Sequence, residues 1–165
     1  LKLSSSTNQT ISINLFIVKI FLVLLFLQLI IGAFVSGMDA GKIYNTWPLM
    51  GVNYFPDDSS FKEFLNLKVF DNPSIVQFIH RNLAYLIIIF YALILFKVIN
   101  TGNNKLYKPI SVIGLTLAFQ IFLGVITILS GVKMLFASLH QINSILIILS
   151  TLYFLFISKY KRQID

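Results

Sequence analysis

The stretch SIVQFIHRNLAYLIIIFYALILF (residues 74–96) is almost entirely apolar, yet it places a histidine and an arginine side by side, His80 and Arg81. A helix that crosses a bilayer needs about 20 mostly apolar residues, and this run is long enough. An ionisable residue inside such a span is costly and marks a functional site by default. The stretch therefore predicts a transmembrane helix, and His80 and Arg81 are the first candidates for functional residues.

Composition extends this prediction to the whole chain. Of the 165 residues, 57% are hydrophobic and only 12% are charged, against about 25% charged in typical soluble domains. The net charge of +7 comes without a basic stripe interleaved with aromatic residues. We attribute it to membrane topology and expect no nucleic-acid partner. The absence of cysteine excludes disulfides, iron–sulfur clusters and thiolate metal sites.

Four apolar runs have the length of a membrane span. They cover residues about 13–37, 74–98, 108–130 and 133–158. No alternating strand pattern is present, so helices are the expected way to cross the bilayer. The joins are a long mixed loop, a short basic loop and the tight turn SGVK. We predict one domain, residues 1–165, with the fold of an all-α integral membrane protein: a four-transmembrane-helix bundle made of two repeated helical hairpins.

Charged residues predict the direction of the spans, because lysine and arginine favour the cytoplasmic side. Basic residues flank the second join and follow the last span, whereas the long first loop mixes acids with lysines. We therefore expect both termini and the second join on the cytoplasmic side, or on the matrix side if the membrane is mitochondrial.

A weak internal repeat relates the two hairpins. The stretches LQLIIGAFVSG and FQIFLGVITILSG share a Gln-x-x-x-Gly pattern, at Gln28 and Gly32 in the first and at Gln120 and Gly124 in the second. We interpret these pairs as packing devices, because small residues let helices approach each other closely. The second span of each hairpin carries a related stretch, HRNLAYL or HQINSIL.

The two histidines of the chain, His80 and His140, both fall inside spans. At 1.5 Å per residue, each lies roughly 9–11 Å from the helix end nearest the long loop. Each is followed one helical turn later by a small residue, Ala84 or Ser144. Repeated hairpins in one orientation are related by an axis along the membrane normal. Such an axis would turn the two imidazoles toward each other at the bundle centre.

Two facing imidazoles inside a four-helix bundle suit the two axial positions of a heme iron. We predict His80 and His140 as metal ligands, and Arg81 as a cofactor-binding residue whose side chain leans toward a heme propionate. Other readings stay open, since intramembrane histidines also hydrogen-bond between helices and Arg81 can anchor the interface. A zinc or copper site is disfavoured, because it wants about four ligands.

Three stretches resemble the C-terminal half of heme A synthase, closest to its proteobacterial and mitochondrial branch. They are GAFVSGMDAGKIYNTWPLMG (Gly32–Gly51), NPSIVQFIHRNLAYL (Asn72–Leu86) and LGVITILSGVKMLFASLHQ (Leu123–Gln141). The most specific part is Asp-Ala-Gly followed by Tyr-Asn-x-x-Pro, within residues 39–48. The resemblance extends from Gln28 to the end of the last span.

This resemblance implies an oxidoreductase that converts the C8 methyl of heme O to the formyl of heme A, with oxygen derived from water, for heme-copper terminal oxidases. The family has eight spans in two similar halves, each with a histidine pair. By resemblance, His80 and His140 are the axial ligands of heme b, and the substrate heme and a catalytic acid belong to the other half. The catalytic residues are therefore unknown here. We expect the chain to be the C-terminal half of a longer protein that cannot complete the reaction alone.

Further expectations follow from the family. They are a bacterial or mitochondrial inner membrane, heme O as substrate, and heme O synthase and an electron donor as partners. A split subunit that assembles as a homo-oligomer is the alternative to a fragment. A bis-His membrane cytochrome b-type electron carrier without synthase activity is the alternative function, with the same cofactor. Asp39 either orders the long loop or contacts the propionate side of the heme.

Overall fold

The computed structural model describes residues 13–65 and 67–160. Within them the chain forms four long helices, α1 (Leu15–Gly37), α2 (Pro73–Thr101), α3 (Asn104–Leu129) and α4 (Met134–Tyr160). The α1–α2 loop holds three short 3-10 helices, η1 (Ala40–Lys42), η2 (Phe61–Leu65) and η3 (Leu67–Asp71). Each of the four long helices is long and apolar enough to cross a membrane. The predicted all-α membrane bundle is confirmed.

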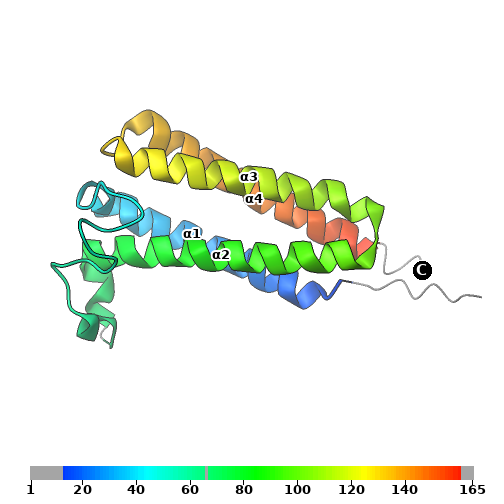
Figure 1. The fold of residues 1–165 in the computed structure, drawn as a ribbon, viewed down its shortest axis with the longest axis horizontal. Helices are drawn as coiled ribbons and strands as arrows, with labels where there is room; N and C mark the ends of the chain where they lie inside the picture. Colours follow the sequence, from blue (N-terminus) through cyan, green and yellow to red (C-terminus); the bar gives the residue numbers. More distant parts are fainter. Residues whose placement is uncertain (1–12, 66, 161–165) are drawn as a thin grey trace, which may run out of the picture.

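The four helices are arranged as two hairpins (Figure 1). α1 packs mainly against α2, and α3 packs mainly against α4, while α1–α4 and α2–α3 contacts join the two hairpins. α2 and α4 are therefore diagonal to each other. The hairpins lie close together at the α2–α3 turn and diverge toward the opposite end, which carries the α1–α2 loop and the α3–α4 turn (Figure 1). We call these the packed end and the loop end.

Helices extend beyond the predicted apolar runs at the packed end. The stretch 99–107, expected to be a loop, is mostly helical, because α2 continues to Thr101 and only Gly102 and Asn103 precede α3. Gly102 takes the left-handed conformation (φ 60°) that ends a helix. The Asn103 side chain accepts a hydrogen bond from the backbone N–H of Lys105 and caps α3. Hydropathy marks the part of a helix that crosses the bilayer, whereas these caps mark where it ends.

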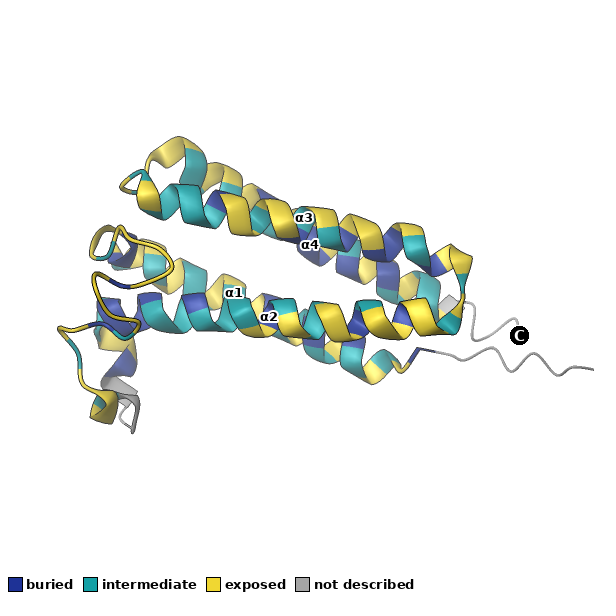
Figure 2. Ribbon diagram, in the orientation of Figure 1, coloured by how far each residue is buried: buried dark blue, intermediate teal, exposed yellow. Residues whose placement is uncertain are grey.

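The largest cluster of buried apolar side chains fills the packed end. Its buried members among the described residues are Ile13, Val18, Phe21, Leu25, Ile87, Ile94, Val98, Leu106, Ile110, Ile113, Leu117, Ile147, Ile148 and Phe154. On every helix, these residues lie on the packed-end side of the level of His80 and His140. The outward faces of the helices are exposed (Figure 2), and they carry large apolar side chains such as Leu115 and Phe16. Such faces suit contact with lipid.

Candidate functional site

The two histidines face each other between the hairpins. His80 comes from α2 and His140 from the diagonal helix α4, and their ring centroids lie 6.5 Å apart with the planes at 68°. Two imidazoles bound to opposite sides of one metal ion, through nitrogens about 2 Å from it, have ring centres about 6 Å apart. The separation therefore fits two axial ligands of one iron. The structure brings the predicted pair together, whereas ligation itself stays a prediction.

The residues around the two histidines favour an iron that is already bound in a porphyrin over a bare metal ion. In the described part of the chain, no group of three or more His, Cys, Asp or Glu side chains is placed to hold a metal ion. A bare ion would be left short of ligands by two histidines. A porphyrin supplies its own ring of nitrogen donors, so two axial imidazoles complete the coordination of its iron. The donor set thus fits heme better than a bare metal ion.

A glycine lies against each imidazole. A Cβ added to Gly32 of α1 would lie 3.2 Å from Cε1 of His80, and one added to Gly124 of α3 would lie 3.0 Å from Cε1 of His140. Both separations are shorter than ordinary van der Waals contact, so a side chain there would push the ring away. The glycines of the repeat are packing devices, as predicted, and what they pack against is the histidine of their own hairpin.

The glutamines of the repeat also contact the histidines. Nε2 of Gln28 lies 3.2 Å from Nε2 of His80, and Nε2 of Gln120 lies 3.3 Å from Nε2 of His140. An amide nitrogen only donates hydrogen bonds, so both imidazole Nε2 atoms act as acceptors. This is the unprotonated state that a metal ligand requires. The sequence pattern predicts only a packing role for these glutamines. Their place one turn before each glycine, on the same helix face, was the signal that pointed to this contact.

The second ring nitrogen is treated differently in the two hairpins. Nδ1 of His140 donates to the backbone carbonyl of Gln120, at 3.1 Å. Nδ1 of His80 is buried and has no hydrogen-bond partner among the described residues. Asn143, which is 4% exposed, donates to Oε1 of Gln120 at 2.7 Å and to the carbonyl of Thr116 at 2.9 Å. Sequence reasoning did not identify Asn143 as part of the site.

Arg81 binds the α1–α2 loop. Its guanidinium donates to the carbonyl oxygens of Leu49, at 3.1 Å, and Tyr44, at 3.0 Å. Gln77, one turn earlier on α2, also donates to the Tyr44 carbonyl, at 3.0 Å. Nε of Arg81 is buried and has no partner among the residues that the structure describes. The side chain leans toward the loop end, as expected, but its observed partners are backbone carbonyls. Contact with a propionate stays a prediction.

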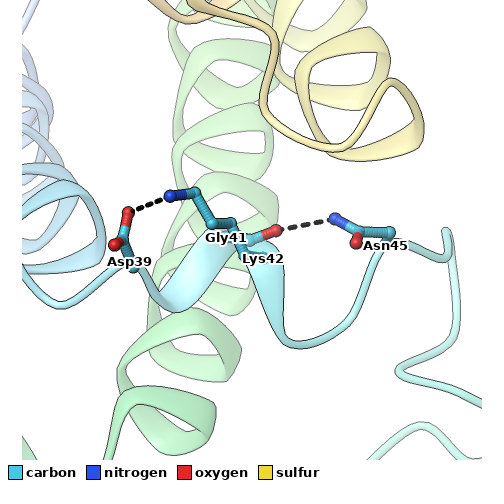
Figure 3. Close-up of polar contacts among 4 residues, drawn as sticks. All are labelled: Asp39, Gly41, Lys42 and Asn45. Atoms are coloured by element: carbon cyan, nitrogen blue, oxygen red, sulfur yellow. Dashed lines mark hydrogen bonds and ion pairs between the residues drawn. The ribbon is translucent and has the colours of Figure 1, made fainter.

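The same loop reaches the second hairpin. Asn45 donates to the carbonyl of Gly41, at 2.8 Å (Figure 3), and to the carbonyl of Ile128 in α3, at 3.1 Å. A Cβ added to Gly41 would lie 3.0 Å from the side chain of Val132, in the α3–α4 turn. Arg81 and Asn45 therefore tie the loop to both hairpins across the loop end of the bundle.

Asp39 contacts the loop itself. Its carboxylate forms an ion pair with Lys42, at 2.8 Å (Figure 3), and the Asp39 side chain is 71% exposed. The residue takes the left-handed conformation (φ 52°) between α1 and η1. Of the two roles that the sequence left open, the observed contact is a local one that orders the start of the loop. An exposed pair of this kind contributes little to stability.

A polar network fastens the middle of the loop to the start of α2. The Tyr44 hydroxyl donates to Asp57, and the hydroxyls of Ser74 and Ser59 donate to Asp58, at 2.6 and 2.9 Å. The pKa of Tyr44 is raised to about 12, mainly by burial and to a smaller extent by the hydrogen bond to Asp57. Burial alone would raise the pKa of Asp58, but the donated hydrogen bonds outweigh it and lower the pKa below 3.8. Both groups are therefore held in their ordinary charge states.

Fold and site together define a class: four-helix membrane proteins that place a pair of histidines between two hairpins. Residues 4–152 match the family profile described as cytochrome oxidase assembly protein (COX15-CtaA). With curated relatives named heme A synthase, this match shows that the chain belongs to the heme A synthase family of cytochrome oxidase assembly proteins.

The relatives come from several bacteria. The chain is 44% identical over 146 residues to the heme A synthase of Pelagibacter ubique (strain HTCC1062), covering 88% of this chain and 42% of that protein. It is 43% identical over 150 residues to that of Wolbachia pipientis wMel, with 90% and 41% covered. It is 33% identical over 135 residues to that of Ruegeria sp. (strain TM1040), with 82% and 35% covered. The chain thus spans less than half the length of these relatives. No solved structure matches it.

Proposed function

We propose that this chain is the heme b-binding half of a heme A synthase, the enzyme that oxidises the C8 methyl of heme O to the formyl of heme A for heme-copper terminal oxidases. The relatives are named heme A synthase, which supports this activity for the whole protein. The observation that carries the role of this half is the facing of His80 and His140 at a ring separation of 6.5 Å.

In this proposal His80 and His140 hold the iron of heme b through their Nε2 atoms. The heme, when bound, supplies one-electron chemistry. The chain contributes the geometry: Gly32 and Gly124 leave room for the rings, and both Nε2 atoms are unprotonated acceptors, which the glutamine amides would give up when iron binds. Arg81, whose buried Nε–H has no partner in the described part of the chain, is the proposed contact for a propionate.

The remaining functions belong to the whole protein. We propose that heme O and the catalytic residues are held by the part of the relatives that this chain does not cover. The membrane is the bacterial inner membrane or its mitochondrial counterpart, with both chain termini on the cytoplasmic or matrix side. The basic residues beside the α2–α3 turn and after α4 support this orientation.

The first test is the heme spectrum of the native gene product that carries this chain. His80→Ala and His140→Ala are each expected to remove the low-spin absorption of the bis-His heme b of this half, measured as the change in a reduced-minus-oxidised spectrum. Tyr91→Phe, at the packed end, is the matched control and should keep it. A full low-spin signal in both histidine variants would show that His80 and His140 are not the ligands of the heme iron.

The second test separates synthase from electron carrier. The native gene product is expressed in a strain that lacks its own heme A synthase and makes heme O, and the extracted hemes are identified by chromatography. Heme A should appear with the wild type and be lost in the histidine variants. An intact low-spin spectrum without any heme A would instead support the bis-His electron carrier.

A further inference from the structure

We propose that the two histidines are unequal ligands: His140 is the anchored ligand, positioned by Gln120 and Asn143, and His80 is the exchangeable one. This inference rests on the proposed heme binding and goes beyond it, because it assigns different properties to two ligands that the sequence repeat presents as equivalent. It also makes Gln120 and Asn143 positioning residues, which act through His140.

His140 has a hydrogen-bond partner at Nδ1 that iron binding at Nε2 would leave in place, whereas its contact with the Gln120 amide at Nε2 would be given up. Its Nδ1–H donates to the Gln120 carbonyl, at 3.1 Å, and its Nε2 faces the Gln120 amide, at 3.3 Å. Donation from Nδ1 leaves the lone pair on Nε2, the nitrogen that would bind the iron. Metal-binding histidines almost always donate their other N–H to a carbonyl, a carboxylate or water, which fixes the ring and raises its basicity. His140 has this support already, before any metal is considered.

Asn143 completes that support. Its amide donates to Oε1 of Gln120 and to the Thr116 carbonyl, so it ties α4 to α3 one turn from His140. This tie keeps the backbone carbonyl of Gln120 within reach of Nδ1 of His140. Asn143 is 4% exposed. Burying an amide costs free energy, and hydrogen bonds such as these two offset that cost.

His80 lacks the corresponding support. Its Nδ1 is buried without a partner among the described residues, and so is Oε1 of Gln28. The Gln28 amide divides its donors between Nε2 of His80, at 3.2 Å, and the His80 carbonyl, at 3.1 Å. No bond in the described part of the chain therefore holds Nδ1 of His80 in the way that the Gln120 carbonyl holds Nδ1 of His140.

The two hairpins also differ at the third residue after the histidine. The third residue after His140 is Asn143, and the third residue after His80 is Leu83. Leucine neither donates nor accepts a hydrogen bond, and Leu83 packs against the apolar cluster. The two hairpins therefore repeat the histidine, the glutamine and the glycine, but among the described residues a side chain donates to Oε1 of the glutamine in the second hairpin and none does so in the first.

The consequence is an order of ligand loss. Removing the partner of a metal-binding histidine typically lowers metal affinity by about 10–100-fold. A bond from His80 to the iron of heme b would therefore be lost before a bond from His140. The vacated position would accept a small neutral ligand of the class of carbon monoxide or free imidazole.

The experiment compares heme retention in the native gene product after purification. His80→Ala should keep a five-coordinate heme that binds carbon monoxide, whereas His140→Ala should retain at least about tenfold less heme. Asn143→Leu should increase the fraction of ferrous heme that binds carbon monoxide, and the reciprocal Leu83→Asn should decrease it. Equal heme retention in the two histidine variants, or equal carbon monoxide binding in wild type and Asn143→Leu, would overturn the inference.

A heme-free measurement guards against variants that fail to assemble. Histidine-selective isotope labelling of the heme-free native gene product gives the NMR ring signals of its histidines, and comparison with the His80→Ala and His140→Ala variants assigns the two rings. The Nδ1–H of His140 should show a hydrogen-bonded chemical shift and slower exchange with solvent than the Nδ1–H of His80. Equal shifts and exchange rates at the two rings would overturn the inference.

Failure of the proposed function looks different. If the wild-type protein gave no low-spin heme signal, heme ligation itself would be wrong, and this inference would fall with it. A normal low-spin wild type with two equivalent histidines would overturn only the inference made here.

Discussion

The guanidinium of Arg81 in α2 donates a 3.1 Å hydrogen bond to the carbonyl oxygen of Leu49, in the loop that covers the loop end of the bundle. Arg81→Ala removes this bond and the one to the Tyr44 carbonyl, each a charged hydrogen bond worth about 1.5–3 kcal/mol when its partner is lost. We expect the loop to loosen. The emission of Trp47, the single tryptophan of the chain, should shift, and proteolysis within the loop should accelerate.

The control for Arg81 is Lys133→Ala, an exposed cation at the same end of the bundle. Arg81→Lys keeps the charge but loses the two-pronged donor, so it should give an intermediate effect. If Arg81→Ala leaves Trp47 emission and proteolysis unchanged but lowers heme affinity, the residue acts on the propionate rather than on the loop.

Gly124→Ala should displace the imidazole of His140. The added Cβ would lie 3.0 Å from Cε1 and 3.4 Å from Nδ1 of that ring, so the ring must move by a few tenths of an ångström. The expected result is a shifted or partly high-spin heme spectrum. Gly37→Ala is the matched control, because a Cβ there meets no described atom within 4 Å. An unaltered spectrum in Gly124→Ala would show that the ring has room that the structure does not indicate.

Gly114→Ala should destabilise the contact between α2 and α3. The new Cβ would overlap the Tyr91 hydroxyl oxygen, which donates to the Ile110 carbonyl at 3.3 Å. The tyrosine must leave its place and lose that bond, at a cost of about 1–3 kcal/mol. Thermal stability in detergent measures the loss. Tyr91→Ala combined with Gly114→Ala should cost less than the two single changes added together, since the clash is then absent. Additive losses would contradict the contact.

Acid should loosen the loop through Asp58. Its pKa in the folded protein lies below the ordinary value of 3.8, so the unfolded loop takes up the proton more readily. The stabilisation is therefore fully present above pH 3.8 and is lost as the pH falls through the lower, folded pKa. Trp47 emission, followed from neutral pH into this range, should report the transition.

Asp58→Asn should remove most of that acid transition, because the amide does not titrate. Asp71→Asn, in the same loop, serves as the control and should keep it. An acid transition of unchanged size in Asp58→Asn would mean that another group governs the opening of the loop.

The membrane fold was predictable because hydropathy is a property of each span by itself. The helix ends were less so: the stretch 99–107 looked like a loop, and only the caps at Gly102 and Asn103 bring α2 and α3 so close. The pairing of His80 with His140 was also predictable, because the repeat supplied both a common depth and a symmetry axis. That argument needs no knowledge of side-chain contacts.

The supporting contacts of the site depend on how neighbouring helices are rotated, which one sequence does not encode locally. The proximity of Gln28 and Gly32 to His80 is a relation between two helices, so the repeat showed that these residues recur without showing what they touch. Arg81 illustrates the same limit. Its lean toward the loop end follows from helix geometry, but its carbonyl partners depend on the path of an irregular loop, for which no periodicity exists.

The confinement of the buried apolar cluster to the packed end bears on biogenesis. Its fully buried members lie away from the level of the histidines, so, under the proposed function, the four spans are expected to assemble in the bilayer before heme b is bound. Insertion then becomes a late step on an already folded scaffold, and the empty form is expected to be a stable species rather than a target for degradation.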